Sequence, residues 1–118
     1  MKVAVIGSRA ITNLDLTPYL PPDCTEILSG GARGVDTCAA DYARAHGLLL
    51  TELRPDYRRY GRGAPHVRNR AIVDGADTVL AFWDGRSRGT ASVINYCKKV
   101  GKPCRVFLLV EPSEASDT

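Results

Sequence analysis

The sequence predicts a single α/β domain of the Rossmann-like type, in which helices cover both faces of a doubly wound parallel sheet to give three layers. Short apolar runs alternate with amphipathic helical patterns along the chain, which is the order expected of parallel strands joined by helical crossovers. The apolar runs lack a regular polar–apolar alternation, as expected for strands that are buried on both faces. The length of 118 residues suits one domain.

Five apolar runs are predicted to be strands, and most of them end at a glycine or just before a turn-forming residue. These runs are Lys2–Gly7, Glu26–Ser29, Leu48–Leu53, Thr78–Trp83 and Arg105–Val110. Right-handed crossovers between them give an open sheet of about five parallel strands in the order 3-2-1-4-5, with the reversal between the first and the fourth strand.

The segments between the strands carry helical periodicity. The predicted helices are Gly34–His46, His66–Asp74 and Thr90–Val100, and Leu14–Leu20 is a shorter candidate before two prolines. Apolar residues that recur from Val35 at helical spacing define the inner face of the first helix, and Gly47 is its stop signal. We expect Val67, Ala71 and Ile72 to face inward in the second helix, and Val93, Cys97 and Val100 in the third.

Composition excludes several classes of protein. No apolar run approaches the roughly 20 residues of a membrane span, and the apolar N-terminal run is too short for a signal peptide. The cysteines (Cys24, Cys38, Cys97 and Cys104) and histidines lack metal-ligand spacing. We therefore expect a cytoplasmic protein that has no membrane association and binds no metal or cofactor. Its thiols are expected to be reduced and mostly buried. The domain is predicted to span residues 1–110, followed by an acidic flexible tail over residues 111–118.

Three strand-to-helix loops carry both glycine and arginine. They are Gly7-Ser8-Arg9, Gly30-Gly31-Ala32-Arg33-Gly34 and Asp84-Gly85-Arg86-Ser87-Arg88-Gly89-Thr90. Glycine lets backbone amides approach a ligand, helix N-termini attract anions, and arginine binds phosphate. Because such loops meet where the strand order reverses, the sequence predicts an anion-binding crevice there. Tight turns with exposed arginines are the alternative.

Four further residues are candidates for the same crevice. Arg68 and Asn69 lie at the start of a predicted helix whose end would point into the crevice, and Arg68 would flank a phosphate together with Arg9. Asp36 would either hold a sugar hydroxyl or lock the glycine-rich loop, and Asp84 would bind ribose, act as a general acid or base, or form a turn. The basic segment Arg54–Arg70 also contains tyrosines, and its Arg54–Gly63 part is interpreted as a lid, a nucleic-acid contact or a solvated loop.

Taken together, the three loops, the Pro55-Asp56-Tyr57 stretch and Arg68-Asn69 resemble the YspA/YpsA-related branch of the SLOG superfamily. The string from Ser29 to Asp36 combined with Ser87-Arg88-Gly89-Thr90 is the most specific part. That superfamily includes the DNA-processing protein DprA and the LOG phosphoribohydrolases. The resemblance implies a Rossmann-like fold and a pocket for nucleotides or their derivatives. Val93 stands where LOG-type enzymes carry a catalytic Glu, so their reaction is not implied.

The leading hypothesis is a small domain that binds a nucleotide-like small molecule as a ligand sensor, with its phosphate on Gly30–Gly34 and Ser87–Thr90. A hydrolase or transferase that acts on the same ligand class, with Asp84 or Asp36 as its catalytic residue, is the second hypothesis. Single-stranded nucleic-acid binding of the DprA kind through Arg58, Arg59, Arg62, Tyr57 and Tyr60 is the third. The resemblance also leaves a homodimer open.

Overall fold

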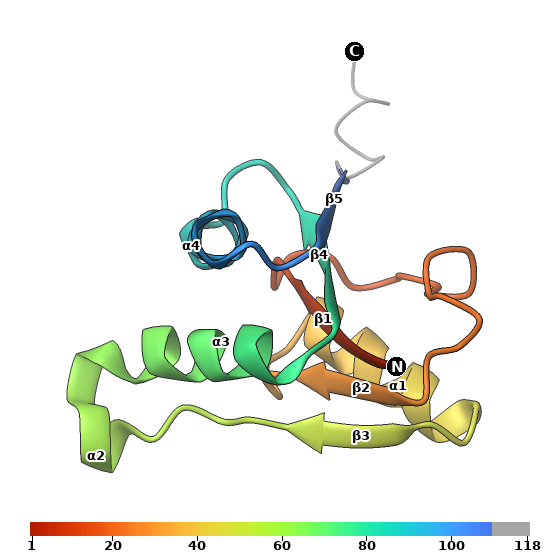
Figure 1. Ribbon diagram of the computed structural model, residues 1–118, viewed down its shortest axis with the longest axis horizontal. Coiled ribbons are helices and arrows are strands. Elements are labelled where there is room, and N and C mark those ends of the chain that lie inside the picture. Colours follow the sequence, from red (N-terminus) through yellow and green to blue (C-terminus); the bar gives the residue numbers. More distant parts are fainter. Residues whose placement is uncertain (110–118) are drawn as a thin grey trace.

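The protein is an α/β domain built on a five-stranded parallel sheet, and the computed structural model describes residues 1–109 (Figure 1). The strand order is β3-β2-β1-β4-β5, which confirms the predicted order. The strands are β1 (Lys2–Gly7), β2 (Glu26–Ser29), β3 (Leu49–Glu52), β4 (Thr78–Trp83) and β5 (Cys104–Leu108). Residue 110 and the predicted tail over 111–118 lie outside the described residues.

Two apolar clusters hold the layers together, one on each face of the sheet. Ala4 and Ile6 of β1 pack against α3 (Ala64–Gly75) and α4 (Arg88–Val100). Val3 and Val5 face the opposite way, because side chains alternate along a strand, and pack with α1 (Val35–Ala45). Helices therefore cover both faces of the sheet, with α3 and α4 on one side and α1 on the other (Figure 1).

The connection from β1 to β2 contains no helix, so the prediction of a short helix over Leu14–Leu20 is wrong. The segment forms one hydrogen-bonded turn, in which Tyr19 and Leu20 donate to the carbonyl of Leu16. The Asp15 carboxylate accepts the amide and the hydroxyl of Thr17 at 3.0 and 2.7 Å, which ties the chain into this turn. Leu16 nevertheless fills the core beside α1, as a helix would have done.

The predicted helices form, but the inner faces of α3 and α4 differ from those expected. In α3, Ile72 is buried whereas Val67 and Ala71 are exposed. The face that meets the sheet runs instead through Ala64, Arg68 and Ile72, which follow each other at one helical turn, so an arginine stands in its middle. In α4, Val93 and Cys97 are buried as expected, but Val100 lies exposed at the end of the helix.

The Arg54–Gly63 segment is helical from Tyr57 onward rather than a continuous loop. It contains α2 (Tyr57–Tyr60), capped by the Asp56 carboxylate, which accepts the Arg59 amide at 3.1 Å, followed by a 3₁₀ turn over Gly61–Gly63. Neither element has a buried residue. The segment forms a corner of the molecule beyond the start of α3 (Figure 1), so the core does not explain its arginine and tyrosine content.

Three further findings concern the described part of the chain. No helix in residues 1–109 is long and apolar enough to cross a membrane. Within the same residues, no group of three or more His, Cys, Asp or Glu side chains is arranged to hold a metal ion. The four cysteines are free, but only Cys97 is buried and the other three are half-buried, so the expectation of mostly buried thiols is wrong.

Candidate ligand-binding crevice

A crevice of about 460 Å³ lies at the carboxyl ends of β1, β2 and β4. Its wall combines residues of all three predicted loops with residues of α3, with residues from the first half of α4 and with one residue of α1. The lining residues are Ile6, Gly7, Ser8, Arg9, Ala10, Gly30, Ala32, Asp36, Pro65, Arg68, Asn69, Ile72, Asp84, Ser87, Gly89, Thr90 and Val93. The volume falls within the range of roughly 300–1,000 Å³ that is typical of small-molecule sites.

Ser8 joins the loop after β1 to the loop after β4. Its side chain is 1% exposed, and its hydroxyl accepts the amide of Asp84 at 3.1 Å. The Ser8 amide donates to the carbonyl of Phe82 at 3.0 Å. Gly7 must be a glycine here, because a β-carbon would lie 2.5 Å from the same carbonyl and 2.6 Å from the Val35 side chain. These contacts fix the floor of the crevice.

The glycine-rich loop Gly30–Gly34 uses several of its own polar groups internally. The amide of Gly31 donates to the Ser29 hydroxyl at 3.4 Å, and the amide of Ala32 donates to the Asp36 carboxylate at 3.1 Å. Gly34 has a φ of 79° and is packed so tightly that a β-carbon would lie 2.5 Å from the carbonyl of Arg9. The loop is therefore a rigid turn, and the backbone of Arg9 packs directly against its last glycine, Gly34.

Asp36 is the most buried acidic group of the crevice, with 9% of its surface exposed. Burial raises the pKa of this carboxyl above its ordinary value of 3.8 and outweighs the opposing effects of the Ala32 amide and the Arg68 charge. One carboxylate oxygen, Oδ2, accepts the Ala32 amide. Asp36 thus locks the glycine-rich loop, as one of its two predicted roles required, and it also lines the crevice.

Arg68 reaches from α3 across the crevice to the strand ends. Its Nη1 donates to the carbonyls of Gly30 and Leu53 at 2.8 and 3.4 Å, and its Nε donates to the Asn69 side-chain oxygen at 2.7 Å. Partial burial lowers the pKa of the guanidinium, whereas the Asp36 charge opposes that shift. Among residues 1–109, no hydrogen bond uses Nη2 of Arg68, so two N–H donors remain for a ligand.

Arg68 and Asp36 approach Gly30 from two directions. A β-carbon on Gly30 would lie 2.6 Å from Nη1 of Arg68 and 2.9 Å from Oδ2 of Asp36. A side chain at Gly30 would therefore displace the Arg68 guanidinium or the Asp36 carboxylate, which both line the same cavity.

The loop after β4 is braced by Asp84 and opens onto the crevice. Oδ1 of Asp84 accepts the amides of Arg86 and Ser87 at 2.9 and 2.8 Å, and these bonds lower the pKa of the carboxyl. The Ser87 hydroxyl caps α4 by accepting the Thr90 amide at 3.4 Å. The amides of Arg88 and Gly89 precede the first bonds within the helix, and Gly89 lines the crevice.

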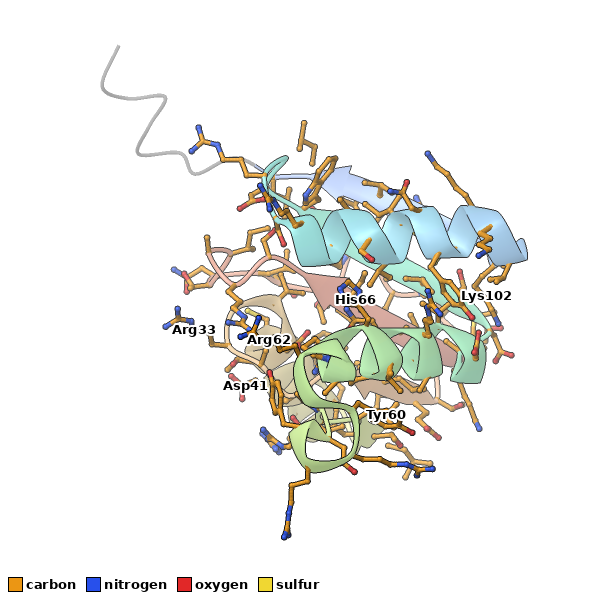
Figure 2. All side chains as sticks on the ribbon, turned by 90° about the vertical axis from the view of Figure 1, so that its left-hand side faces the viewer. Arg33, Asp41, Tyr60, Arg62, His66 and Lys102 are labelled. Atoms are coloured by element: carbon orange, nitrogen blue, oxygen red, sulfur yellow. The ribbon has the colours of Figure 1, made fainter. Side chains whose placement is uncertain are left out.

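Most predicted site residues meet in this one place, but some do not. The lining includes Gly7, Ser8, Arg9, Gly30, Ala32, Asp36, Arg68, Asn69, Asp84, Ser87, Gly89 and Thr90. It leaves out Gly31, Arg33, Gly34, Gly85 and Arg88. Arg33 and Arg88 are exposed, and Figure 2 shows Arg33 at the edge of the molecule with its guanidinium directed outward.

Two supporting residues were missed by the sequence reasoning. Arg54 donates from Nη1 to the carbonyl of Gly31 at 3.1 Å, which ties the chain after β3 to the glycine-rich loop. Ser29 is fully buried and accepts the Gly31 amide through its hydroxyl. A buried polar residue at the end of an apolar strand is the signal that could have identified Ser29; no local signal separates Arg54 from its neighbouring arginines.

Comparisons with known proteins give one similarity. The chain is 41% identical over 83 residues to the gene 61 protein of Mycobacterium phage D29, a match that covers 65% of this chain and 66% of the phage protein. The matched part is thus just under two thirds of the length of that protein. No family model matches the sequence, and no solved structure matches it.

Proposed function

We propose that the protein binds a nucleotide or a nucleotide-derived small molecule in the crevice, with a phosphate group at the start of α4. The observation that carries this proposal is Gly89. A β-carbon at Gly89 would meet no atom within 4 Å, so packing does not require glycine there. Glycine in a helix is less favourable than alanine by about 0.5–1 kcal/mol, and open access of a ligand to the helix amides explains its presence.

The groups around Gly89 suit a phosphate ester. The start of α4 supplies free amides and the positive end of a helix dipole, and Arg68 supplies two unused donors on Nη2. The hydroxyl of Thr90 faces that of Ser87 at 3.2 Å. These are the donor types that bind phosphate in proteins.

Carboxylates in the same cavity suit the sugar part of such a ligand. Asp36 and Asp84 line the crevice and each has one oxygen in a loop hydrogen bond, which leaves a second oxygen to accept a hydroxyl. The resemblance to the YspA/YpsA-related branch of the SLOG superfamily supports the same ligand class. The proposal therefore combines phosphate recognition by α4 with hydroxyl recognition by a carboxylate.

A hydrolase or transferase on this ligand class is less well supported. The lowered pKa of Asp84 keeps this carboxyl ionised near neutral pH, which disfavours a role as general acid. Asp36 has the raised pKa that a proton donor needs, but its Oδ2 accepts the Ala32 amide, so only Oδ1 is left to donate a proton. Turnover that Asp36→Asn abolishes while binding persists would move the proposal to an enzyme.

The test is a thermal-unfolding screen against nucleoside monophosphates, diphosphates and nucleotide sugars at about 1 mM, because a ligand that binds only the folded state raises the melting temperature. We expect at least one compound to raise it, and Arg68→Gln to remove that rise. Arg44→Gln is the control, because Arg44 lies on α1 and is exposed. A panel without any stabilising compound would contradict the proposal.

Single-stranded nucleic acid is a second candidate, favoured by the exposed surface of α2. Tyr57 is 58% and Tyr60 41% exposed, and the Arg59 guanidinium lies over the Tyr60 ring at 5.2 Å. Exposed aromatic and arginine side chains stack bases and bind phosphates. Affinity for an oligonucleotide that falls by about 0.7 log units per log unit of salt for each phosphate contacted would support it. Binding that is absent or insensitive to salt would exclude it.

A further inference from the structure

A second, smaller cavity lies between α3 and α4, next to the crevice. Its volume is about 200 Å³. His66 and Arg70 of α3 form one side, and Ser92, Asn95 and Lys99 of α4 form the other. Figure 2 shows His66 on the side of α3 that faces α4. We call this cavity the α3–α4 groove.

The groove is lined by cations and neutral hydrogen-bonding groups. Arg70 and Lys99 carry positive charges, and no carboxylate of the described residues is part of the lining. Neither cation forms an ion pair within residues 1–109. This composition differs from that of the crevice, where Asp36 and Asp84 are part of the wall. The positive charge of the groove is therefore not neutralised by its own wall.

Arg70 is held in place without using a carboxylate. Its guanidinium lies over the Tyr96 ring at 5.4 Å, which is a favourable cation–π geometry. The Tyr96 hydroxyl donates to Oδ1 of Asp74 at 2.8 Å, and this bond raises the pKa of the tyrosine and keeps it protonated. Asp74, the acidic group nearest to this arrangement on α3, is thus engaged by Tyr96, and the N–H groups at the edge of Arg70 remain available.

The groove and the crevice share a wall. Asn69 of α3 and Val93 of α4 line both cavities, so these two side chains form the partition between them. The side-chain oxygen of Asn69 accepts Nε of Arg68 at 2.7 Å, which fixes the amide and leaves its NH₂ group to donate to a ligand. A ligand group in the groove would therefore lie directly beside one in the crevice.

We propose that the α3–α4 groove is a second anion-binding subsite, selective for a phosphate or carboxylate group that Arg70 and Lys99 hold. We further infer, on the basis of the proposed function, that a single ligand with two phosphate groups occupies both cavities. One phosphate lies at the start of α4 and the other lies in the groove, on the far side of Asn69 and Val93. The crevice alone then binds the ligands that carry a single phosphate.

The test is an NMR titration of the ¹⁵N-labelled chain with inorganic phosphate at constant ionic strength. The amides of Asn95 and Lys99 report on the groove, and that of Gly89 reports on the crevice. We expect saturable shifts at Asn95 and Lys99, and an apparent affinity about tenfold weaker in the double variant Arg70→Gln with Lys99→Gln, because charge-assisted hydrogen bonds are lost. The matched control is Arg44→Gln with Lys98→Gln, which removes two exposed charges outside the groove.

The outcomes separate this inference from the proposed function. Shifts at Asn95 and Lys99 that are absent or do not saturate, or an equal loss in the control pair, would overturn the groove as a site. If the Gly89 amide does not shift while Asn95 and Lys99 do, the crevice proposal is contradicted and the groove remains a site.

A nucleoside 3′,5′-bisphosphate should bind about tenfold more tightly than the 5′-monophosphate, and the double variant should abolish this difference. Equal affinities of the original chain for the two nucleotides would contradict the two-phosphate ligand.

Discussion

The two glycine-rich loops beside the crevice, Gly30–Gly34 and Asp84–Thr90, both carry glycine and arginine but differ in structure. In Gly30–Gly34 the amides of Gly31 and Ala32 bind Ser29 and Asp36, and the backbone of Arg9 packs against Gly34. In the loop after β4, Asp84 and Ser87 brace the turn, and Gly89 faces open space at the start of α4. A glycine in the first loop serves the fold, whereas Gly89 leaves room for a ligand.

This difference shows that a run of glycine and arginine does not by itself identify a phosphate cradle. Two structural properties distinguish a loop that is free to bind phosphate: its amides have no hydrogen-bond partner within the protein, and a β-carbon at its glycine would meet open space rather than protein atoms. By both criteria the start of α4 is the open side of the crevice and Gly30–Gly34 is the closed side.

The largest expected effect is on stability, at Gly34. Replacing Gly34 by Ala forces a side chain into a φ of 79° and against the Arg9 backbone, so we expect the free energy of unfolding to fall by about 3 kcal/mol. Gly89→Ala is the matched variant and should raise the free energy of unfolding by about 0.5 kcal/mol, because alanine is the better helix former. Urea denaturation of both proteins measures the contrast, and equal effects would refute it.

The two arginines that donate hydrogen bonds to carbonyls of the Gly30–Gly34 loop should contribute differently to the free energy of unfolding. Arg68→Gln leaves the carbonyls of Gly30 and Leu53 without their partly buried donor, and we expect a loss of about 2 kcal/mol. Arg54→Gln removes a donor from an exposed side chain that contacts Gly31, and its loss should stay below about 1 kcal/mol. Urea denaturation of the two variants compares these losses. A larger loss for Arg54→Gln would show that the Arg54–Gly31 hydrogen bond stabilises the loop more than the hydrogen bonds of Arg68 do.

Gly89→Val should separate binding from folding. The valine side chain would extend into open space in the crevice, so the fold is retained while a phosphate is displaced. Because overpacking costs about 1–3 kcal/mol, affinity for the best compound of the nucleotide panel should fall about tenfold. Isothermal titration calorimetry gives the affinity, and unchanged binding would place the ligand elsewhere.

The smallest expected effects concern pH, and they have opposite signs in the two loops. Burial raises the pKa of Asp36 above 3.8, so the folded state binds the proton more tightly, and this contribution to stability is lost as pH rises through the raised pKa. Hydrogen bonds lower the pKa of Asp84, so its contribution is present above the ordinary value and is lost as pH falls through the lowered pKa.

Urea denaturation between about pH 3 and pH 7 should therefore distinguish Asp36→Asn from Asp84→Asn, since linkage gives their pH slopes opposite signs. Relative to the original chain, the Asp36 variant should gain stability as pH rises and the Asp84 variant should lose it. Parallel curves for the two variants would show that the carboxylates have the same environment.

The fold could be predicted from the sequence because its signals are local and repeated. Apolar runs such as Thr78–Trp83 are buried on both faces and are separated by helical patterns, which determines a parallel sheet. The prediction of a helix over Leu14–Leu20 failed because the apolar spacing there serves a single turn that starts at Leu16. Pro18 lies within this turn, and Pro21 and Pro22 follow it and prevent a longer helix.

The candidate site could be located but not resolved in detail. Glycine-bearing loops indicated the edge of the sheet where the crevice lies, and Arg68 and Asn69 line it as predicted. The inner face of α3 was misread, because Val67 and Ala71 are exposed and a polar stripe through Arg68 and Asn69 faces inward instead. The polar stripe is the wall of the crevice, so the pattern departs from that of a core helix at the site itself. The internal closure of Gly30–Gly34 depends on Arg9, which is distant in sequence, and no local pattern reveals it.

The most direct measurement is a crystal structure of the chain with the tightest nucleoside monophosphate of the panel. We expect the phosphate to lie within hydrogen-bond distance of the Gly89 and Thr90 amides and of Nη2 of Arg68. A phosphate seated on Gly31–Arg33, or a nucleotide bound away from the crevice, would contradict it.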